Sequence, residues 1–143
     1  GVEEATVEEL AEFDGILFGS PTRFGNRTSQ LSSFLDQTGP LWQEGKLHAK
    51  TAGFFTGAAT MHGGHETTIL TMSTFAMHMG MVIVPAGYAL GEEMGSTRTG
   101  GSPYGPTHFS PMGGDDAGLD DDERAIAMSY AMHFNQVTDK LAS

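Results

Sequence analysis

The sequence predicts an α/β fold built around a parallel sheet. Three short runs, 15–18, 51–56 and 81–85, are apolar throughout instead of alternating with polar residues, which is typical of strands covered by helices on both faces. Helical patterns lie between the runs. This strand–helix–strand–helix–strand order favours parallel strands that are joined by right-handed crossovers.

The first run ends in a tight turn that contains Pro21 and Gly25. A helical pattern around Leu31 and Phe34 follows this turn and is closed by Gly39-Pro40. Open α/β sheets bind ligands at the carboxyl edge of their strands, so the turn is a candidate binding site. Its backbone N–H groups, one cation and one exposed aromatic side chain suit a flat polar ring with an apolar end.

The second helix is expected over 65–79, where Ile69 and Met72 stand at helical spacing. Residues 88–118 are rich in Gly, Pro, Ser and Thr, and we expect a long loop there, which in a compact domain is usually functional or disordered. A last helix opens with acidic residues at 120–123, which suit the positive end of a helix dipole.

The composition of the chain excludes several classes of function. The 143 residues suit one domain, and 18 acidic against 7 basic residues give a net charge of −11, which argues against nucleic-acid binding driven by electrostatics. This acidity is either an ordinary solvated surface or an adaptation to high salt. The lack of cysteine excludes disulfides, thiolate metal sites and cysteine catalysis. No apolar run approaches a membrane span, so we expect a cytoplasmic protein.

A metal centre is not expected. His62 and His65 flank a glycine pair, but their spacing alone is weak support for a zinc site and no third ligand stands near them in the sequence. The acidic residues at 115–116 and 120–122 lack the spacing and the glycine of a calcium-binding EF-hand loop. We interpret these acidic residues as solvated charge.

Several segments together resemble the Trp repressor-binding protein family. The members of this family are flavodoxin-like, FMN-dependent NAD(P)H:quinone oxidoreductases. The segments are Gly-Ser-Pro-Thr-Arg-Phe-Gly-Asn at 19–26, Phe-Leu-Asp-Gln-Thr-Gly at 34–39 with Leu-Trp at 41–42, Gly-Met-Val-Ile-Val-Pro at 80–85 and Gly-Gly-Ser-Pro-Tyr-Gly at 100–105. The resemblance runs from about Thr6 to Leu141. It implies a three-layer α/β/α domain over 1–143, FMN as cofactor, NAD(P)H and quinone as substrates, and a homo-oligomer, a dimer or a homotetramer.

The resemblance implies that two loops hold the flavin. Thr22, Arg23 and Phe24 match the loop that wraps the isoalloxazine ring, where backbone N–H groups can bond its N1/O2/N5 edge. A core position for Phe24 and a plain surface charge for Arg23 are the alternatives. The second loop is matched by Ala58, Ala59, Thr60, Met61, His62 and Gly63. This segment is bulkier than the family's usual Ser, Thr and Gly, and a simple strand-to-helix turn is its alternative.

Two further residues take roles from the resemblance. His78 matches a histidine beside the flavin and is the catalytic candidate, as a donor to the flavin edge or to a quinone oxygen. Its alternative is a helix-end histidine favoured by the dipole. Trp42 matches a position that lines the substrate cleft, where an aromatic face can stack on a nicotinamide or quinone ring. Because the family residue usually comes from near a neighbouring subunit, Trp42 also implies assembly; a core tryptophan is its alternative.

Part of the family fold has no counterpart in the sequence. A flavodoxin-like sheet has the strand order 2-1-3-4-5, and the predicted strands correspond to its third, fourth and fifth. We therefore expect a chain truncated at the N-terminus, without the phosphate-binding loop and with one edge of its first strand uncovered. A fragment of a longer protein, a partner chain or self-association would each account for this, and the start at Gly1 favours the first two.

The leading functional hypothesis is the two-electron reduction of quinones by NAD(P)H through FMN. A non-catalytic flavodoxin-like module is the second, because a missing phosphate loop would leave FMN weakly bound or unbound. A one-electron flavodoxin-type carrier is the third, and the family motifs do not favour it.

Overall fold

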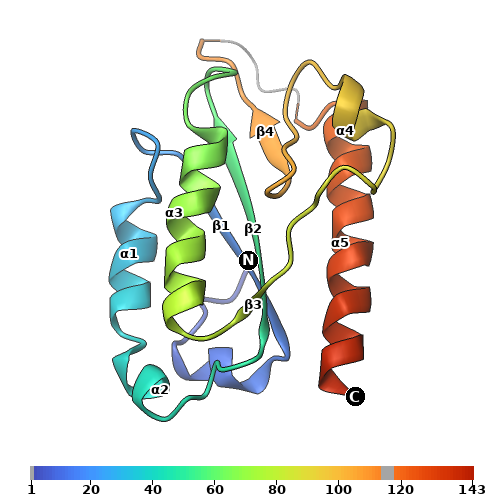
Figure 1. Cartoon of the computed structure of the whole chain (residues 1–143). Helices are drawn as coiled ribbons and strands as arrows, with labels where there is room; N and C mark the ends of the chain where they lie inside the picture. Colours follow the sequence, from blue (N-terminus) through green and yellow to red (C-terminus); the bar gives the residue numbers. More distant parts are fainter. Residues whose placement is uncertain (1, 114–117) are drawn as a thin grey trace.

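A parallel sheet forms the centre of the molecule (Figure 1). The structure is a computed structural model that describes residues 2–113 and 118–143. β1 (Gly15–Pro21) and β2 (Thr51–Ala58) pair in parallel along their length, and β3 (Val82–Ile83) and β4 (Thr107–Phe109) both add in parallel to β2. The predicted α/β fold with a parallel sheet is therefore confirmed.

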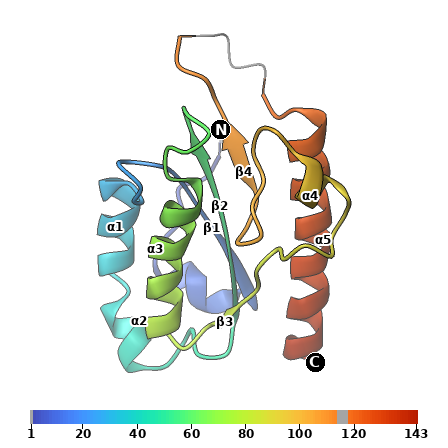
Figure 2. The same cartoon turned by 45° about the horizontal axis from the view of Figure 1, so that its top comes forward.

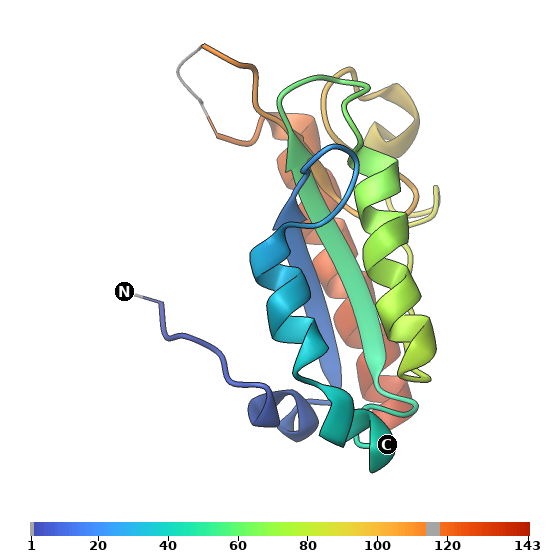
Figure 3. The ribbon, with the colours of Figure 1, turned by 90° about the vertical axis from the view of Figure 1, so that its left-hand side faces the viewer.

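Helices cover both faces of the sheet and make three layers. α1 and α3 lie on one face, and α5 lies on the other (Figures 1 and 3). Short helices η1, α2 and α4 complete the fold. The helix bounds are η1 Glu8–Glu12, α1 Ser29–Asp36, α2 Gly39–Gln43, α3 His65–His78, α4 Glu93–Ser96 and α5 Asp121–Ala142.

Capping side chains fix where the main helices begin. The Thr28 side chain accepts a hydrogen bond from the Leu31 N–H and starts α1. Asp120 and Glu123 form a reciprocal capping box at the start of α5, so the predicted acidic opening of the last helix is confirmed. The predicted acidic pair Asp115-Asp116 lies outside the described residues.

The main core lies between the sheet and the α1/α3 layer. Phe18 of β1 and Phe54 of β2 stack with ring centroids 5.8 Å apart, and Ile69 and Met72 of α3 pack beside them, as their helical spacing predicts. On the other face, β2 carries Gly53, where an added Cβ would lie 2.3 Å from the Tyr130 hydroxyl oxygen. The glycine thus lets α5 approach the sheet closely.

The second half of the chain differs from expectation in two details, although a strand does form within 81–85. The run 81–85 forms only the two-residue strand β3, and the expected long loop 88–118 contains both α4 and β4 among its described residues. β3 pairs with the beginning of β2 and β4 pairs with its end. Between them the Tyr130 hydroxyl accepts from the Phe54 N–H (3.2 Å) and donates to the Val84 carbonyl (2.8 Å), which closes the gap.

The outer edge of β1 is uncovered. Among the described strands β1 pairs only with β2, so the expectation of a free edge is confirmed. Beside this edge Leu17 and Phe55 are 42% and 47% exposed and line an apolar cavity of about 250 Å³ together with residues of α5. Within the described ranges, no helix has both the length and the hydropathy to cross a bilayer.

Candidate functional site

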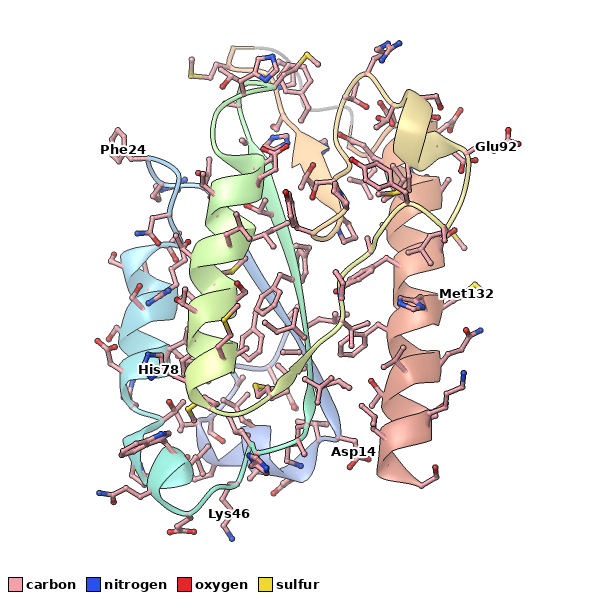
Figure 4. All side chains as sticks on the ribbon, in the orientation of Figure 1. Asp14, Phe24, Lys46, His78, Glu92 and Met132 are labelled. Carbon is pink, nitrogen blue, oxygen red and sulfur yellow. The ribbon has the colours of Figure 1, made fainter. Side chains whose placement is uncertain are left out.

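The loop after β1 is a closed turn with an exposed aromatic tip. The Arg23 N–H donates to the Asn26 carbonyl at 2.8 Å, and the Asn26 N–H donates back to the Arg23 carbonyl at 3.1 Å. Between them Phe24 has a φ of 54°, in the left-handed region that non-glycine residues rarely occupy. Its ring is fully exposed and points away from the body of the protein (Figure 4), so Phe24 is not a core aromatic.

Thr22 anchors this turn to the strands and to α3. Its N–H donates to the Gly57 carbonyl of β2 at 3.0 Å. Its hydroxyl oxygen accepts from the Gly25 N–H at 3.1 Å and from the hydroxyl of Thr68, a fully buried residue of α3, at 2.9 Å. The turn is therefore held at the carboxyl edge of the sheet from two sides.

The loop after β2, residues 59–64, packs directly on the first loop. Gly64 has a φ of 109°, and an added Cβ would lie 2.7 Å from the Gly25 Cα and 3.0 Å from the Thr22 hydroxyl oxygen. Only glycine fits both this backbone conformation and this contact. The structure thus brings the two predicted ligand loops together at one edge, as the views from two sides show (Figures 2 and 3).

These loops present backbone donors that the protein does not use. Within the described residues, the N–H groups of Phe24 and of 59–62 donate to no protein acceptor. Gly64 offers no side-chain cap at the start of α3. The Arg23 guanidinium is exposed and donates to the Thr22 carbonyl at 2.9 Å. Uncharged N–H donors with one nearby cation suit the nitrogen and carbonyl edge of a flat heteroaromatic ring such as isoalloxazine.

His65 is a buried residue that follows the second loop directly. It is 4% exposed, and its Nε2 atom has no hydrogen-bond partner in the described structure. Burial lowers the pKa of His65, although Glu66 beside it acts in the opposite direction. Within the described residues no three His, Asp or Glu side chains are grouped as metal ligands would be.

Glu123 joins three segments near this edge, and sequence analysis gave it no such role. Its buried carboxylate accepts from the N–H groups of Gly100 (2.9 Å), Phe109 (2.8 Å) and Asp120 (3.2 Å) and lies 2.7 Å from His108 Nδ1. The loop before β4, the end of β4 and the start of α5 therefore meet on one carboxylate. Its position in the first helical turn predicted only a favourable interaction with the helix dipole, and most of its partners are distant in sequence.

The structure places His78 far from these loops within one chain. α3 starts at the carboxyl edge and runs back for 14 residues, about 21 Å, so its last residue lies at the other end of the molecule from Phe24 (Figure 4). The helix-end alternative describes its place. Trp42 lies on α2 and is 58% exposed, which rules out the core alternative in the chain as described.

Comparisons with known proteins agree with this architecture. The family model for NADPH-dependent FMN reductase matches residues 3–95. A protein named NAD(P)H dehydrogenase (quinone) from Geobacter sulfurreducens is 58% identical over 105 residues, which are 71% of this chain and 50% of that protein. One of the same name from Acidithiobacillus ferrooxidans is 44% identical over 139 residues, which are 96% of this chain and 69% of that protein.

A solved structure supports the fold. The flavodoxin, WrbA-like protein from Agrobacterium tumefaciens superimposes with a TM-score of 0.67 over 93% of this chain and 71% of that chain, at 23% sequence identity. This chain spans between half and about two thirds of the length of the curated relatives it matches. The family match covers most of the chain, and the chain belongs to the NADPH-dependent FMN reductase family.

Proposed function

We propose that this chain carries the flavin-binding edge of an FMN-dependent NAD(P)H dehydrogenase that reduces quinones. The observation that carries the proposal is the cluster of unused N–H donors on two loops that touch through Gly64 and Gly25. Bound FMN would supply the hydride chemistry. The loops of the chain would position the ring and stabilise negative charge that develops on its N1/O2 edge.

The overall reaction needs no nucleophile or general base from the protein. NAD(P)H gives a hydride, solvent gives a proton, and the quinone takes up two electrons and two protons to become a hydroquinone. One site serving both substrates in turn predicts ping-pong kinetics. Parallel initial-rate lines with varied NADH and menadione are therefore expected, and intersecting lines would contradict a shared site.

The donor set fits the ring of FMN better than its phosphate. Phosphates usually bind several N–H groups at a helix N-terminus. At the described loops the start of α3 is the one candidate, and Gly64 there is already packed against Gly25. This favours a second candidate function, a flavodoxin-like module that binds flavin weakly and acts through protein contacts.

An FMN titration separates these two functions. We expect flavin fluorescence quenching with saturation, an absorbance band near 450 nm, and NADH-dependent menadione reduction. Gly64→Ala would push Cβ into Gly25 and should weaken FMN binding at least about tenfold. Gly45→Ala is the matched control, because Gly45 also has a positive φ but has open space around it. Quenching without reduction would favour the binding module.

We also propose that the protein works as a homo-oligomer, a dimer or tetramer, in the cytoplasm. Exposed Trp42 lies on α2, at the opposite end of the sheet from the loops (Figure 1), and exposed His78 lies far from Phe24 (Figure 4). Another copy of the chain would therefore have to bring them to the flavin, as the family resemblance implies. Light scattering at several concentrations tests the assembly. Trp42→Ala should lower both the apparent mass and quinone reduction, and a monomer with full activity would contradict this proposal.

A further inference from the structure

One buried hydroxyl of α3 forms its hydrogen bond outside its own helix. A Thr or Ser hydroxyl in a helix ordinarily donates to a carbonyl three or four residues earlier. Within α3, which the structure describes throughout, four hydroxyls donate to the carbonyl three residues earlier, those of Thr67, Thr71, Ser73 and Thr74. The Thr68 hydroxyl donates instead to the Thr22 hydroxyl oxygen, which is 2.9 Å away and 46 residues earlier in the chain.

The helix, and not the loop, fixes the position of this donor. Thr68 is 0% exposed, so water does not compete for its hydroxyl. Its backbone N–H donates to the Gly64 carbonyl at 3.0 Å, in the first turn of α3. The Thr68 side chain is therefore a rigid support beneath the turn that follows β1.

Thr22 is left with a single hydrogen-bonding capacity. A hydroxyl can accept two hydrogen bonds through its lone pairs and can donate one. The Thr22 oxygen accepts from the Gly25 N–H at 3.1 Å and from the Thr68 hydroxyl at 2.9 Å, which uses both lone pairs. Among residues 2–113 and 118–143 no acceptor receives the hydrogen of the Thr22 hydroxyl. Thr22 can therefore only donate to a ligand.

The surroundings of Thr22 keep this donor at the candidate site. Its N–H donates to the Gly57 carbonyl at 3.0 Å, and an added Cβ at Gly64 would lie 3.0 Å from its hydroxyl oxygen. The Thr22 side chain is nevertheless partly exposed, so its hydrogen is within reach of a ligand at the two loops. Such a ligand must present an acceptor there, either a carbonyl oxygen or an unprotonated ring nitrogen.

We propose that Thr68 is a positioning residue that fixes the Thr22 hydroxyl as a donor to an acceptor atom of the flavin ring. This inference rests on the proposed function and adds the residue that selects the accepting edge of the ring. Thr68 itself touches no ligand. Its contribution is to binding and orientation, and no proton or electron passes through it.

Two substitutions separate the Thr68 hydroxyl from the shape of its side chain. Thr68→Val keeps the shape without the hydroxyl, and Thr68→Ser keeps the hydroxyl. The Kd for FMN, measured by fluorescence quenching, should rise about five- to tenfold in Thr68→Val, the effect of one hydrogen bond, and less than about twofold in Thr68→Ser. Thr71→Val is the matched control, because the Thr71 hydroxyl donates to a carbonyl of its own helix. It should leave the Kd unchanged.

Flavin analogues test whether the Thr22 hydroxyl meets an acceptor. 1-Deaza-FMN and 5-deaza-FMN each replace one ring nitrogen with C–H, and 2-thio-FMN and 4-thio-FMN each replace one carbonyl oxygen with sulfur, a weak acceptor. At least one analogue should bind about five- to tenfold more weakly than FMN to the unsubstituted protein and to Thr68→Ser. For Thr68→Val the same difference should be under about twofold, because the contact is already lost.

Three results would overturn the inference. Thr68→Val could weaken FMN and all four analogues by the same factor, which is the result expected of a merely structural role. Thr68→Ser could bind FMN as weakly as Thr68→Val. The unsubstituted protein could bind FMN and all four analogues equally, a measurement that depends on no variant.

Amide hydrogen exchange of the ligand-free protein separates this role from the proposed function. Because Thr68 holds the oxygen that accepts from the Gly25 N–H, Thr68→Val should speed exchange at Gly25 about fivefold, and Thr71→Val should not. An unchanged rate at Gly25 in Thr68→Val would overturn the positioning role. Failure of the unsubstituted protein to bind FMN would instead overturn the proposed function.

Discussion

The hydroxyl of Tyr130 stands where the sheet lacks a strand residue, between β3 and β4. Replacing Tyr130 with Phe keeps the ring but leaves the Phe54 N–H and the Val84 carbonyl buried without a partner. We expect a loss of about 1–3 kcal/mol in the free energy of unfolding. Urea unfolding followed by circular dichroism measures it. Tyr88→Phe, at an exposed tyrosine, should cost nothing, and an equal loss in both variants would contradict the bridging role.

The same hydroxyl makes stability depend on alkaline pH. Burial raises the pKa of Tyr130 to about 12, above the ordinary value of 10.0. Between these values the unfolded chain releases a proton that the folded chain keeps, so the free energy of unfolding falls as pH rises from 10 to 12, by about 3 kcal/mol in total. Urea titrations at pH 9 and 11.5 test this. The Tyr130→Phe variant should show a shallower decline.

His65 makes stability depend on pH in the acidic range, where the free energy of unfolding falls as the pH is lowered. Burial lowers the pKa of His65, so below the ordinary value of 6.5 the unfolded chain binds a proton that the folded chain resists. Burial of neutral His65 therefore costs no stability above pH 6.5, and the free energy of unfolding falls as the solution is acidified below that value. Glu66, Glu123 and His108 also act on this ring.

Unfolding at pH 7.5 and 5.5 measures the effect of His65. The His65→Gln variant should lose part of the difference between the two values, because its amide does not titrate. His48→Gln is the control at an exposed histidine and should keep the whole difference. An unchanged pH dependence in His65→Gln would show that other groups account for it.

At the scale of elements, Glu123 holds the loop before β4, β4 itself and α5 together. Glu123→Gln keeps the size of the side chain, but an NH₂ group would then face donors that now reach a carboxylate. We expect a loss of about 2–3 kcal/mol and faster proteolysis between 97 and 109. Asp121→Asn, in the same helical turn but exposed, is the control. Equal proteolysis in both variants would contradict this role.

Element prediction succeeded where the signal was local and failed where it depended on a partner. α3 starts at the predicted His65 because its buried residues repeat at helical spacing. The apolar run 81–85 forms a strand only to Ile83, because a strand needs hydrogen bonds from a neighbour and the next position beside β2 is taken by the Tyr130 hydroxyl. β4 is three residues in a Gly- and Pro-rich segment and has no periodicity to detect.

At the scale of the whole molecule, the two ligand loops were predictable and the place of His78 was not. Thr22 and Gly64 meet because the carboxyl ends of neighbouring parallel strands share one edge, a property of strand order alone. His78 is separated from that edge by the full length of α3. A motif match predicts which residues serve a site, but it does not say whether a single chain can bring them together.

The charge of the whole molecule gives the last prediction. The chain has 18 acidic and 7 basic residues, and among the described residues one lysine–carboxylate pair, Lys46–Glu44 at 3.5 Å, lies within contact distance. Most acidic groups are thus without a close cation, and their mutual repulsion opposes the compact state. Sodium chloride should screen this repulsion and raise the free energy of unfolding by about 1 kcal/mol.

The shape of the salt curve separates an ordinary acidic surface from adaptation to high salt. The Debye length falls to about 8 Å at 0.15 M and about 3 Å at 1 M, so simple screening is mostly complete by a few hundred millimolar. Urea unfolding from 0.02 to 3 M NaCl should then rise and level off, with KCl giving the same curve. A rise that continues to molar salt would indicate a protein adapted to a saline environment, and no rise at all would mean that acidic repulsion contributes nothing measurable to its stability.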